Sequence, residues 1–227
     1  MRGHAKVAAP VVWADHVRIP MGNVSLDGDL VLPPEPRGVV LFAHGSGSSR
    51  FSPRNQAIAE VLNDHGFGTL LFDLLTWEEE ALEAKAGYLR FDVDLLANRL
   101  IGATRWVQRR ADTGDLPIGY FGASTGAAAA LVATAQGGES VQAVVSRGGR
   151  PDLAGAALPQ VTTPTLLIVG GRDRVVIELN QQAVARLSGI KELKVVPGAT
   201  HLFEEPGTLE EVARLATAWF RRHLRGR

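Results

Sequence analysis

The chain contains no cysteine among its 227 residues. Disulfide bridges, thiolate metal sites and a cysteine nucleophile are therefore excluded. The chain also has no excess of one charge, because 24 Lys and Arg residues balance 24 Asp and Glu residues. Without a net positive field, we expect no binding to the phosphate backbone of nucleic acids.

Long hydrophobic runs are absent as well. No stretch approaches the roughly 18 consecutive apolar residues of a membrane-spanning helix, so we expect no membrane partner. Residues 1–17 hold one short apolar run, which Pro10, Trp13 and Asp15 interrupt, and no hydrophobic region of signal-peptide length. We therefore expect a cytoplasmic protein.

What remains is an average globular composition. Hydrophobic residues make up 45% of the chain and charged residues 21%, which separates it from disordered sequences. No repeat, low-complexity tract or linker divides the sequence. Its length suits a single α/β domain over residues 1–227.

Short apolar runs recur after residue 38, and each ends in glycine or a polar turn. Continuous apolar character is typical of strands buried on both faces of a parallel sheet. The predicted core strands are 39–43, 68–73, 118–121, 141–145, 165–169 and 193–196. Before them, runs 17–20 and 24–33 predict an antiparallel hairpin with Gly22 and Asn23 as its turn.

Segments with helical spacing lie between these runs. The predicted helices are 53–64, 92–110, 125–136, 178–187 and 208–224. The alternation of strand and helix predicts a doubly wound α/β fold with helices on both faces of the sheet. Residues 74–91 are expected to form a helical or mobile flap, and residues 146–163 are too few for a large cap domain.

The motif GASTG at 122–126 directly follows the predicted strand 118–121 and precedes an alanine-rich helix. This is G-x-S-x-G in the strand-turn-helix context that the motif requires. Glycine stands at both ends because a Cβ there would collide with the neighbouring strand or helix in so sharp a turn. Ser124 is therefore the predicted nucleophile, placed at a helix N-terminus that favours developing negative charge.

A serine nucleophile needs a histidine base and a carboxylate that orients the base. Asp173 follows the run 165–169 through a GGR turn, and His201 lies in the loop after the run 193–196. Taken singly, Asp173 fits a turn or helix cap and His201 fits a surface loop. Together, at strand ends that meet at one sheet edge and in the order Ser, Asp, His, they predict a catalytic triad.

The first core strand ends in HGSGSS at 44–49. Backbone N–H groups in such a glycine-rich turn hold an oxyanion without reorganising, and we assign this role to the N–H groups of Ser46 and Thr125. The alternative is a phosphate-binding loop, although the Lys-Ser/Thr ending of a P-loop is missing. His44 is expected to be a structural, hydrogen-bonded side chain rather than a second base.

Four motifs carry a resemblance that covers nearly the whole chain: HGSGSSR at 44–50, GASTG at 122–126, GGRD at 170–173 and GATH at 198–201. The sequence resembles the α/β-hydrolase superfamily and is similar within it to the dienelactone hydrolase-like esterases. The resemblance implies an α/β-hydrolase fold with a mostly parallel, eight-stranded sheet, and ester hydrolysis through an acyl-enzyme. Dienelactone hydrolases proper use a cysteine nucleophile, which this chain lacks, so ordinary carboxylic esters are the expected substrates.

We expect a carboxylesterase-type serine hydrolase that acts on a small-molecule ester with the triad Ser124, Asp173 and His201. No cofactor is expected, and no metal, because the sequence has no H-E-x-x-H or similar cluster of ligands. Two alternatives stay open. A thioesterase, acyltransferase or peptidase would use the same triad, and a non-enzymatic receptor of this fold would bind a ligand in the same place.

Substrate-pocket residues are predicted from their nearness to the motif loops. Arg147 and Arg150 are candidates for binding an anionic substrate group, with a solvated position or an ion pair to Asp152 as the alternative. The final helix, 208–224, carries an apolar stripe that either forms a homodimer face or packs on the sheet. Four apolar side chains are candidates for an apolar pocket, with a core role equally open: Phe51, Trp77, Leu202 and Phe203.

Overall fold

One sheet runs through the computed structural model, which describes residues 13–86, 88–137 and 141–226. Its strand order is β1-β2-β4-β3-β5-β6-β7-β8, and only the pairings of β1 with β2 and of β2 with β4 are antiparallel. The mostly parallel, eight-stranded sheet implied by the sequence is thereby confirmed. The strands are β1 (Trp13–Met21), β2 (Val24–Leu32), β3 (Val39–Ala43), β4 (Gly68–Phe72), β5 (Ile118–Ala123), β6 (Val141–Arg147), β7 (Thr165–Gly170) and β8 (Lys191–Val196).

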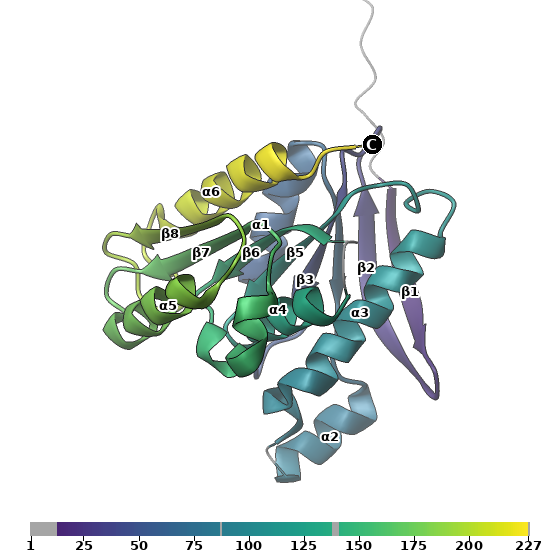
Figure 1. Cartoon of the computed structure of the whole chain (residues 1–227). Coiled ribbons are helices and arrows are strands. Elements are labelled where there is room, and N and C mark those ends of the chain that lie inside the picture. The colour runs from purple at the N-terminus through teal and green to yellow at the C-terminus, as the bar shows by residue number, and fades with distance from the viewer. Residues whose placement is uncertain (1–12, 87, 138–140, 227) are drawn as a thin grey trace, which may run out of the picture.

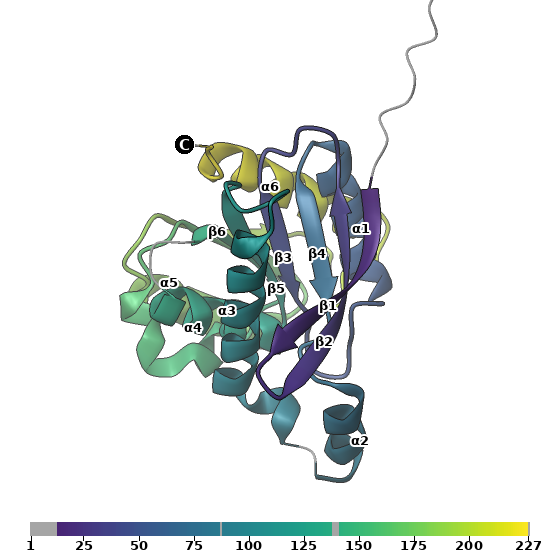
Figure 2. The same ribbon diagram turned by 90° about the vertical axis from the view of Figure 1, so that its right-hand side faces the viewer.

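Helices cover both faces of this sheet, with α1 and α6 on one face and α3, α4 and α5 on the other (Figures 1 and 2). The apolar stripe of α6 is buried against the sheet. The helical segments are α1 (Pro53–Asp64), α2 (Trp77–Ala86), η1 (Leu89–Phe91), α3 (Val93–Arg109), α4 (Thr125–Gly137), η3 (Pro151–Gln160), α5 (Arg174–Arg186) and α6 (Thr208–His223).

The predicted helices are confirmed, with one clear difference in extent. Helix α5 begins at Arg174, well before the predicted residue 178, and Asp173 is its N-cap residue. The β-branched residues Val175 and Val176 lower helix propensity and hid this first turn from the sequence prediction. Helix α1 begins as predicted, because the Ser52 side chain accepts the Asn55 N–H and Pro53 stands at its first position.

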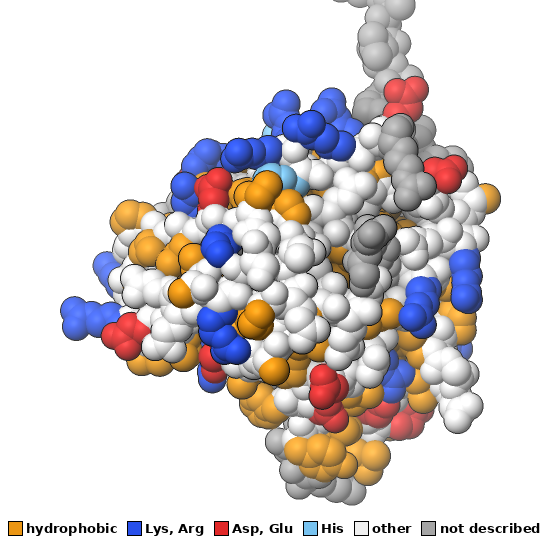
Figure 3. All heavy atoms as spheres, viewed as in Figure 1, with side chains coloured by type: hydrophobic (Ala, Val, Ile, Leu, Met, Phe, Trp, Pro, Cys, Tyr) orange, Lys and Arg blue, Asp and Glu red, His pale blue; other side chains and the backbone are white. Residues whose placement is uncertain are grey.

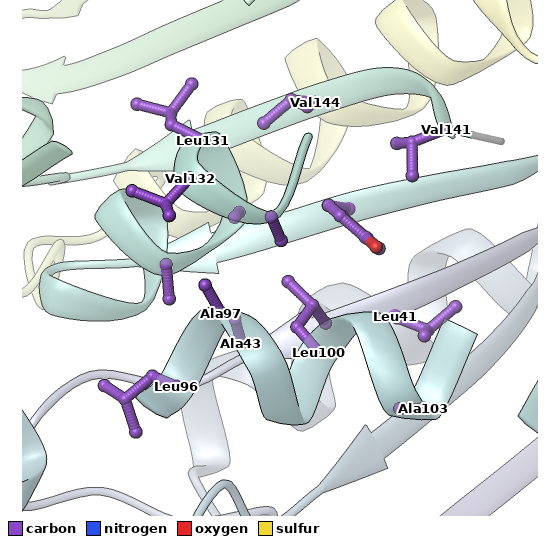
Figure 4. Packing of buried hydrophobic residues seen from close by; sticks show 14 of the residues in the cluster. Leu41, Ala43, Leu96, Ala97, Leu100, Ala103, Leu131, Val132, Val141 and Val144 are labelled. Atoms are coloured by element: carbon purple, nitrogen blue, oxygen red, sulfur yellow. The ribbon is translucent and has the colours of Figure 1, made fainter. Parts of the chain in front are cut away.

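Two hydrophobic cores form, one on each face of the sheet. Along β3, Leu41 faces one core while Val40 and Phe42 face the other, which is why the strand is continuously apolar. Figure 4 shows Leu96 and Leu100 of α3 in the first core, in which α4 and β3 also take part. Burial on both faces fixes the register of the strands and so the positions of the loops at their carboxyl ends.

The segment 74–91 folds as α2 and η1, so the helical interpretation of this flap is confirmed. It lies beyond the sheet at the lower end of the molecule in Figure 1. Hydrophobic side chains gather in this region on the face shown in Figure 3. Large exposed apolar side chains from the segment are Trp77, Leu82, Tyr88 and Phe91.

After β6 the chain forms η3, a 3-10 segment that is broken at Gly155 (φ 48°, ψ −118°). Within the described ranges, no insertion forms a large cap over the strand ends, as predicted. Among all the residues that the structure describes, no helix is long and apolar enough to cross a membrane. Of the N-terminal segment 1–17 used in the sequence analysis, residues 1–12 lie outside the described residues.

Candidate active site

A sharp turn at Ser124 joins β5 to α4. Ser124 has φ 50°, in the left-handed region that side chains other than glycine disfavour. The flanking glycines make the turn sterically feasible: a Cβ on Gly122 would lie 2.4 Å from Ala127 Cα, and one on Gly126 would lie 2.1 Å from Ala43 O. The predicted steric reason for both glycines therefore holds.

Backbone hydrogen bonds fix this turn from both sides. The Ser124 N–H donates to the Arg147 carbonyl at the end of β6 (3.2 Å). The Ser124 carbonyl accepts N–H groups from Ala127 and Arg150, each at 3.1 Å. Because the end of β6 holds its N–H, and α4 and the loop after β6 hold its carbonyl, Ser124 keeps its strained conformation.

The side chains of Asp173 and His201 form a direct pair. Asp173 Oδ2 lies 2.6 Å from His201 Nδ1. The Asp173 side chain is largely buried, while that of His201 is partly exposed. A carboxylate at this position favours the tautomer with a proton on Nδ1 and leaves Nε2 free to accept one.

Close packing of two loops brings this pair together. A Cβ on Gly170 would lie 2.4 Å from the Thr200 carbonyl and 2.6 Å from that of Ala199. The Arg172 N–H donates to the Ala199 carbonyl at 2.9 Å. The exit from β7 and the loop before α6 are thus interlocked through their backbones.

Gly148 connects the pair with the turn at Ser124. It follows Arg147, whose carbonyl accepts the Ser124 N–H, and its own Cβ position lies 3.5 Å from His201 Nδ1 and Cε1. A Cβ there would be in van der Waals contact with the imidazole and would lie 3.2 Å from the His201 carbonyl oxygen. The end of β6 therefore supports both Ser124 and the His201 ring.

The two N–H groups assigned to an oxyanion hole lie on neighbouring loops. The Ser46 N–H donates to the Thr125 hydroxyl oxygen at 2.8 Å. In this conformation the Thr125 hydroxyl oxygen accepts a hydrogen bond from the Ser46 N–H. Thr125 is also buried and follows Ser124 at the start of α4.

The structural role predicted for His44 is confirmed. Its Nε2 accepts the Leu74 N–H at 3.0 Å, which leaves Nδ1 to donate to the Gly45 carbonyl at 3.0 Å. Burial lowers the pKa of His44, so the neutral imidazole is favoured. His44 thereby ties the loop after β3 to the segment after β4.

Arg50 anchors the other end of the same loop. Its backbone N–H donates to Asp73 Oδ1 at 2.8 Å, its guanidinium pairs with the Asp73 carboxylate, and its Nε lies 3.3 Å from Asp29 Oδ2. Sequence reasoning gave Arg50 no role, although it closes the HGSGSSR motif. Its two acidic partners come from β2 and from the end of β4, and no pattern in the sequence connects them.

A groove of about 630 Å³ opens beside this loop. Phe51 and Trp77, two of the predicted pocket residues, line it and are 59% and 80% exposed. Gly47 and Leu75 line both this groove and a smaller hollow that reaches Gly45. Since a Cβ on Gly45 would lie 3.0 Å from Ser124 Cβ, the hollow extends to the immediate neighbourhood of Ser124.

The other predicted pocket residues lie elsewhere, around His201. Leu202 is partly exposed, whereas Phe203 is 2% exposed and packs in the core with α6. This placement corrects the expectation that Phe203 lines an open pocket, because its side chain packs among the apolar residues of the core, the alternative left open above. The four apolar candidates therefore do not form one pocket.

The two arginine candidates differ in their surroundings. Arg150 forms two hydrogen bonds with Asp152, at 2.9 and 2.7 Å, and this pairing raises the pKa of Arg150. The ion-pair alternative therefore holds for Arg150. Arg147 is instead buried and donates to Asn55 Oδ1 at 3.4 Å.

Within the described residues, no group of three or more His, Asp or Glu side chains is arranged to hold a metal ion. The chemistry that the arrangement offers lies in the serine at the strained turn and in the paired imidazole and carboxylate.

Comparison with known proteins shows which family this chain is related to. Residues 36–216 match the family model described as an alpha/beta hydrolase domain. The chain belongs to the α/β-hydrolase family. This result agrees with the resemblance seen in the four sequence motifs.

Two curated relatives of this chain come from two strains of Mycobacterium tuberculosis. Each is 60% identical to this chain over 219 residues, and each is named a putative phosphoribosyl transferase. The match covers 96% of this chain but 48% of each relative. The chain thus spans about half the length of these curated relatives.

Solved structures of similar α/β hydrolases support the fold. A dienelactone hydrolase from Anabaena variabilis superposes with a TM-score of 0.92 at 57% identity, over 94% of this chain and 99% of that one. Est1E from Butyrivibrio proteoclasticus superposes with a TM-score of 0.76 at 16% identity, over 91% of this chain and 98% of the other. The first is a close relative, and the second supports the fold alone.

Proposed function

We propose that the chain is a serine hydrolase that cleaves carboxylic esters through an acyl-enzyme. The observation that carries this proposal is the 2.6 Å pair of Asp173 and His201, together with a strained serine in G-x-S-x-G at the end of β5. The name of the Anabaena variabilis relative, a dienelactone hydrolase, supports hydrolysis of an ester bond. A lactone is a cyclic ester, so the same chemistry extends to open-chain esters.

In the first half of the proposed reaction, His201 Nε2 takes the proton of the Ser124 hydroxyl as its oxygen attacks the ester carbonyl. Asp173 stabilises the imidazolium that forms. Collapse of the tetrahedral intermediate breaks the bond to the alcohol, which leaves with the proton from His201. Ser124 then carries the acyl group.

In the second half, His201 removes a proton from water, and the hydroxide oxygen attacks the acyl-enzyme. Collapse returns the proton to Ser124 and releases the carboxylic acid. In both halves the N–H of Thr125, at the start of α4, is the proposed donor to the oxyanion. The Ser46 N–H joins it when the oxyanion replaces the Thr125 hydroxyl as its acceptor.

The groove beside Phe51 and Trp77 is the proposed binding site for one apolar part of the ester. Its aromatic rings supply apolar surface next to the loop that carries Ser46. An open groove without a cap suits small or flexible substrates.

The test is hydrolysis of p-nitrophenyl esters, from acetate to long acyl chains, by the wild-type protein and by Ser124→Ala. We expect turnover that depends on Ser124. Ser188→Ala is the matched control, because Ser188 is distant from the site and its hydroxyl donates a hydrogen bond to the Pro159 carbonyl. Substantial kcat in Ser124→Ala would overturn the nucleophile assignment. A stoichiometric burst without turnover would indicate the receptor alternative, and turnover of acyl thioesters alone would indicate a thioesterase.

The transferase name of the Mycobacterium tuberculosis relatives yields a second experiment. These proteins are about twice as long as the matched region, so their name describes a larger protein. We expect this chain to release no diphosphate from phosphoribosyl diphosphate, because its proposed site contains a nucleophile and base for acyl transfer. Release that persists in Ser124→Ala would assign a second activity to the chain.

A further inference from the structure

A groove of about 770 Å³ lies between α3 and the turn of the β1–β2 hairpin, here termed the α3 groove. Residues 20–24 line one side of it, and α3 lines the other side from Leu95 to Arg109. The α3 residues recur every three or four positions, so they form one face of the helix about 20 Å long. The α3 groove shares no described lining residue with the groove at Phe51 and Trp77, and it is therefore separate from the proposed substrate site.

The two walls of the α3 groove meet at Gly102. A Cβ on this glycine would lie 2.3 Å from Met21 Sδ, so a larger residue would displace the Met21 side chain. α3 and β1 also lie side by side in Figures 1 and 2. Both walls are thus held by the packing of α3 on the edge of the sheet.

Three arginines of α3 line the α3 groove: Arg99, Arg105 and Arg109. The Arg99 side chain is 11% exposed, pairs with Glu79 of α2 at 2.5 Å, and has an Nε without a hydrogen-bond partner. Arg105 and Arg109 are exposed, and no carboxylate among the described residues pairs with either of them. Because no Asp or Glu belongs to the described lining, the groove carries an excess of positive charge.

Arg105 and Arg109 stand four positions apart, so their Cβ atoms lie roughly 6 Å apart on the same side of α3. Two like charges at this spacing destabilise a helix. The next residue, Arg110, is neutralised through two hydrogen bonds to Asp112, at 2.9 and 2.7 Å. An oxyanion bound between Arg105 and Arg109 would supply the negative charge that the described part of the chain does not.

Apolar side chains lie beside these two arginines. Trp106 lines the α3 groove and is partly exposed, and the guanidinium carbon of Arg110 lies 4.8 Å from its ring centroid. Met21 and Leu95 add aliphatic surface to the same groove. A ring and aliphatic groups next to unpaired guanidinium groups suit a ligand that is apolar at one end and anionic at the other.

We propose that the α3 groove is a second binding site, which takes a small molecule with an aromatic or apolar body and one oxyanion, a carboxylate or a phosphate. Arg105 and Arg109 hold the oxyanion, because planar guanidinium groups donate in pairs to both kinds. The body of the ligand packs on Trp106. The second site does not depend on the proposed ester hydrolysis, so each can fail without the other.

The test uses three probes that share a nitrophenyl ring: 4-nitrobenzoate, 4-nitrobenzylphosphonate and the neutral 4-nitrobenzyl alcohol. Calorimetric titration gives the affinity of each probe for the wild type and for Arg105→Gln/Arg109→Gln. We expect the better-bound anion to bind the wild type about tenfold or more tightly than the alcohol, since a charge-assisted hydrogen bond contributes on that order. The double variant should lose this difference, and the better-bound anion identifies the preferred oxyanion.

Arg214→Gln/Arg221→Gln is the matched control, because it removes two exposed arginines from α6 on the opposite face of the sheet. This variant should bind the anions as the wild type does. A nitrophenyl ring quenches tryptophan fluorescence on contact, so the bound anion should also quench the wild type. Trp106→Phe should lose this part of the quenching, and full quenching in that variant would contradict the placement of the ligand body.

Equal affinity of the three probes for the wild type, or no binding at all, would overturn the second site. Unchanged anion binding by Arg105→Gln/Arg109→Gln would do the same, because the anions would then bind elsewhere on the protein. Loss of anion binding in both double variants would show a dependence on overall charge and would also reject the site. Loss with Arg105 and Arg109 alone would assign anion binding to the α3 groove, even if the protein cleaved no ester.

Discussion

The Ser46 N–H and the Thr125 hydroxyl oxygen lie 2.8 Å apart, although 79 positions separate them in the sequence. This bond joins the loop after β3 to the first residue of α4. It holds the loop beside Ser124 and at the same time occupies an amide that an oxyanion would need. The position of the loop and the proposed oxyanion binding therefore both involve one hydroxyl group.

Replacement of Thr125 by valine should reveal the structural part of this role. Thr125→Val keeps the shape of the side chain but leaves the Ser46 N–H without its acceptor, which should lower the free energy of unfolding by about 1–2 kcal/mol. Thr125→Ser, which keeps the hydroxyl, is the control. Urea unfolding measures both, and equal stability of the two variants would show that the bond does not hold the loop.

Asp173→Asn should reduce kcat by roughly 10³- to 10⁴-fold while the fold is retained. An amide at this position favours the wrong tautomer of His201 and does not stabilise the imidazolium. The control is Asp152→Asn, which alters the ion pair with Arg150 near the same sheet edge. Near-normal turnover by Asp173→Asn would mean that another acid orients the histidine.

The sheet was largely predictable because strands that are buried on both faces have continuous apolar sequences. The edge strand β8 departs from this rule, since Lys191 and Glu192 begin it and remain at least partly exposed, and its start was accordingly missed. The first turn of α5 was missed because β-branched residues disguise it.

The candidate site shows the same division. Asp173 and His201 stand in local motifs at strand ends, so their pairing could be anticipated. The bond between Ser46 and Thr125 could not, because it depends on how two distant loops face each other. Likewise, an arginine after a strand is usually solvated, and only tertiary packing under α1 buries Arg147.

Gly170→Ala should impair catalysis from outside the triad. The added Cβ would lie 2.4 Å from the Thr200 carbonyl, so the loop that carries His201 must move. A displacement of about 1 Å can cost on the order of 100-fold in rate. Gly137→Ala, where the nearest atom would be 3.7 Å away, is the control for adding a methyl group. Full activity of Gly170→Ala on the same ester would show that the interlocked loops do not position His201.

The buried His44 predicts a pH dependence of stability. Because burial lowers its pKa in the folded state, the unfolded chain takes up the proton first as the pH falls. Its contribution to stability is complete above the ordinary pKa of about 6.5 and is lost below it, by at most about 1.4 kcal/mol per pH unit. Urea unfolding at pH 7.5 and 5.5 should therefore show a smaller loss in His44→Gln than in the wild type. Equal losses would contradict the assignment.

At Ser124, the left-handed backbone favours glycine, whereas the proposed reaction requires a hydroxyl group. Glycine would relieve the strain there, on the order of 1 kcal/mol, and would remove the hydroxyl that the proposed reaction uses. The residue that best fits this turn is thus one that cannot act as a nucleophile. A search for more stable variants of this chain would select the loss of its reactive group unless activity were selected at the same time.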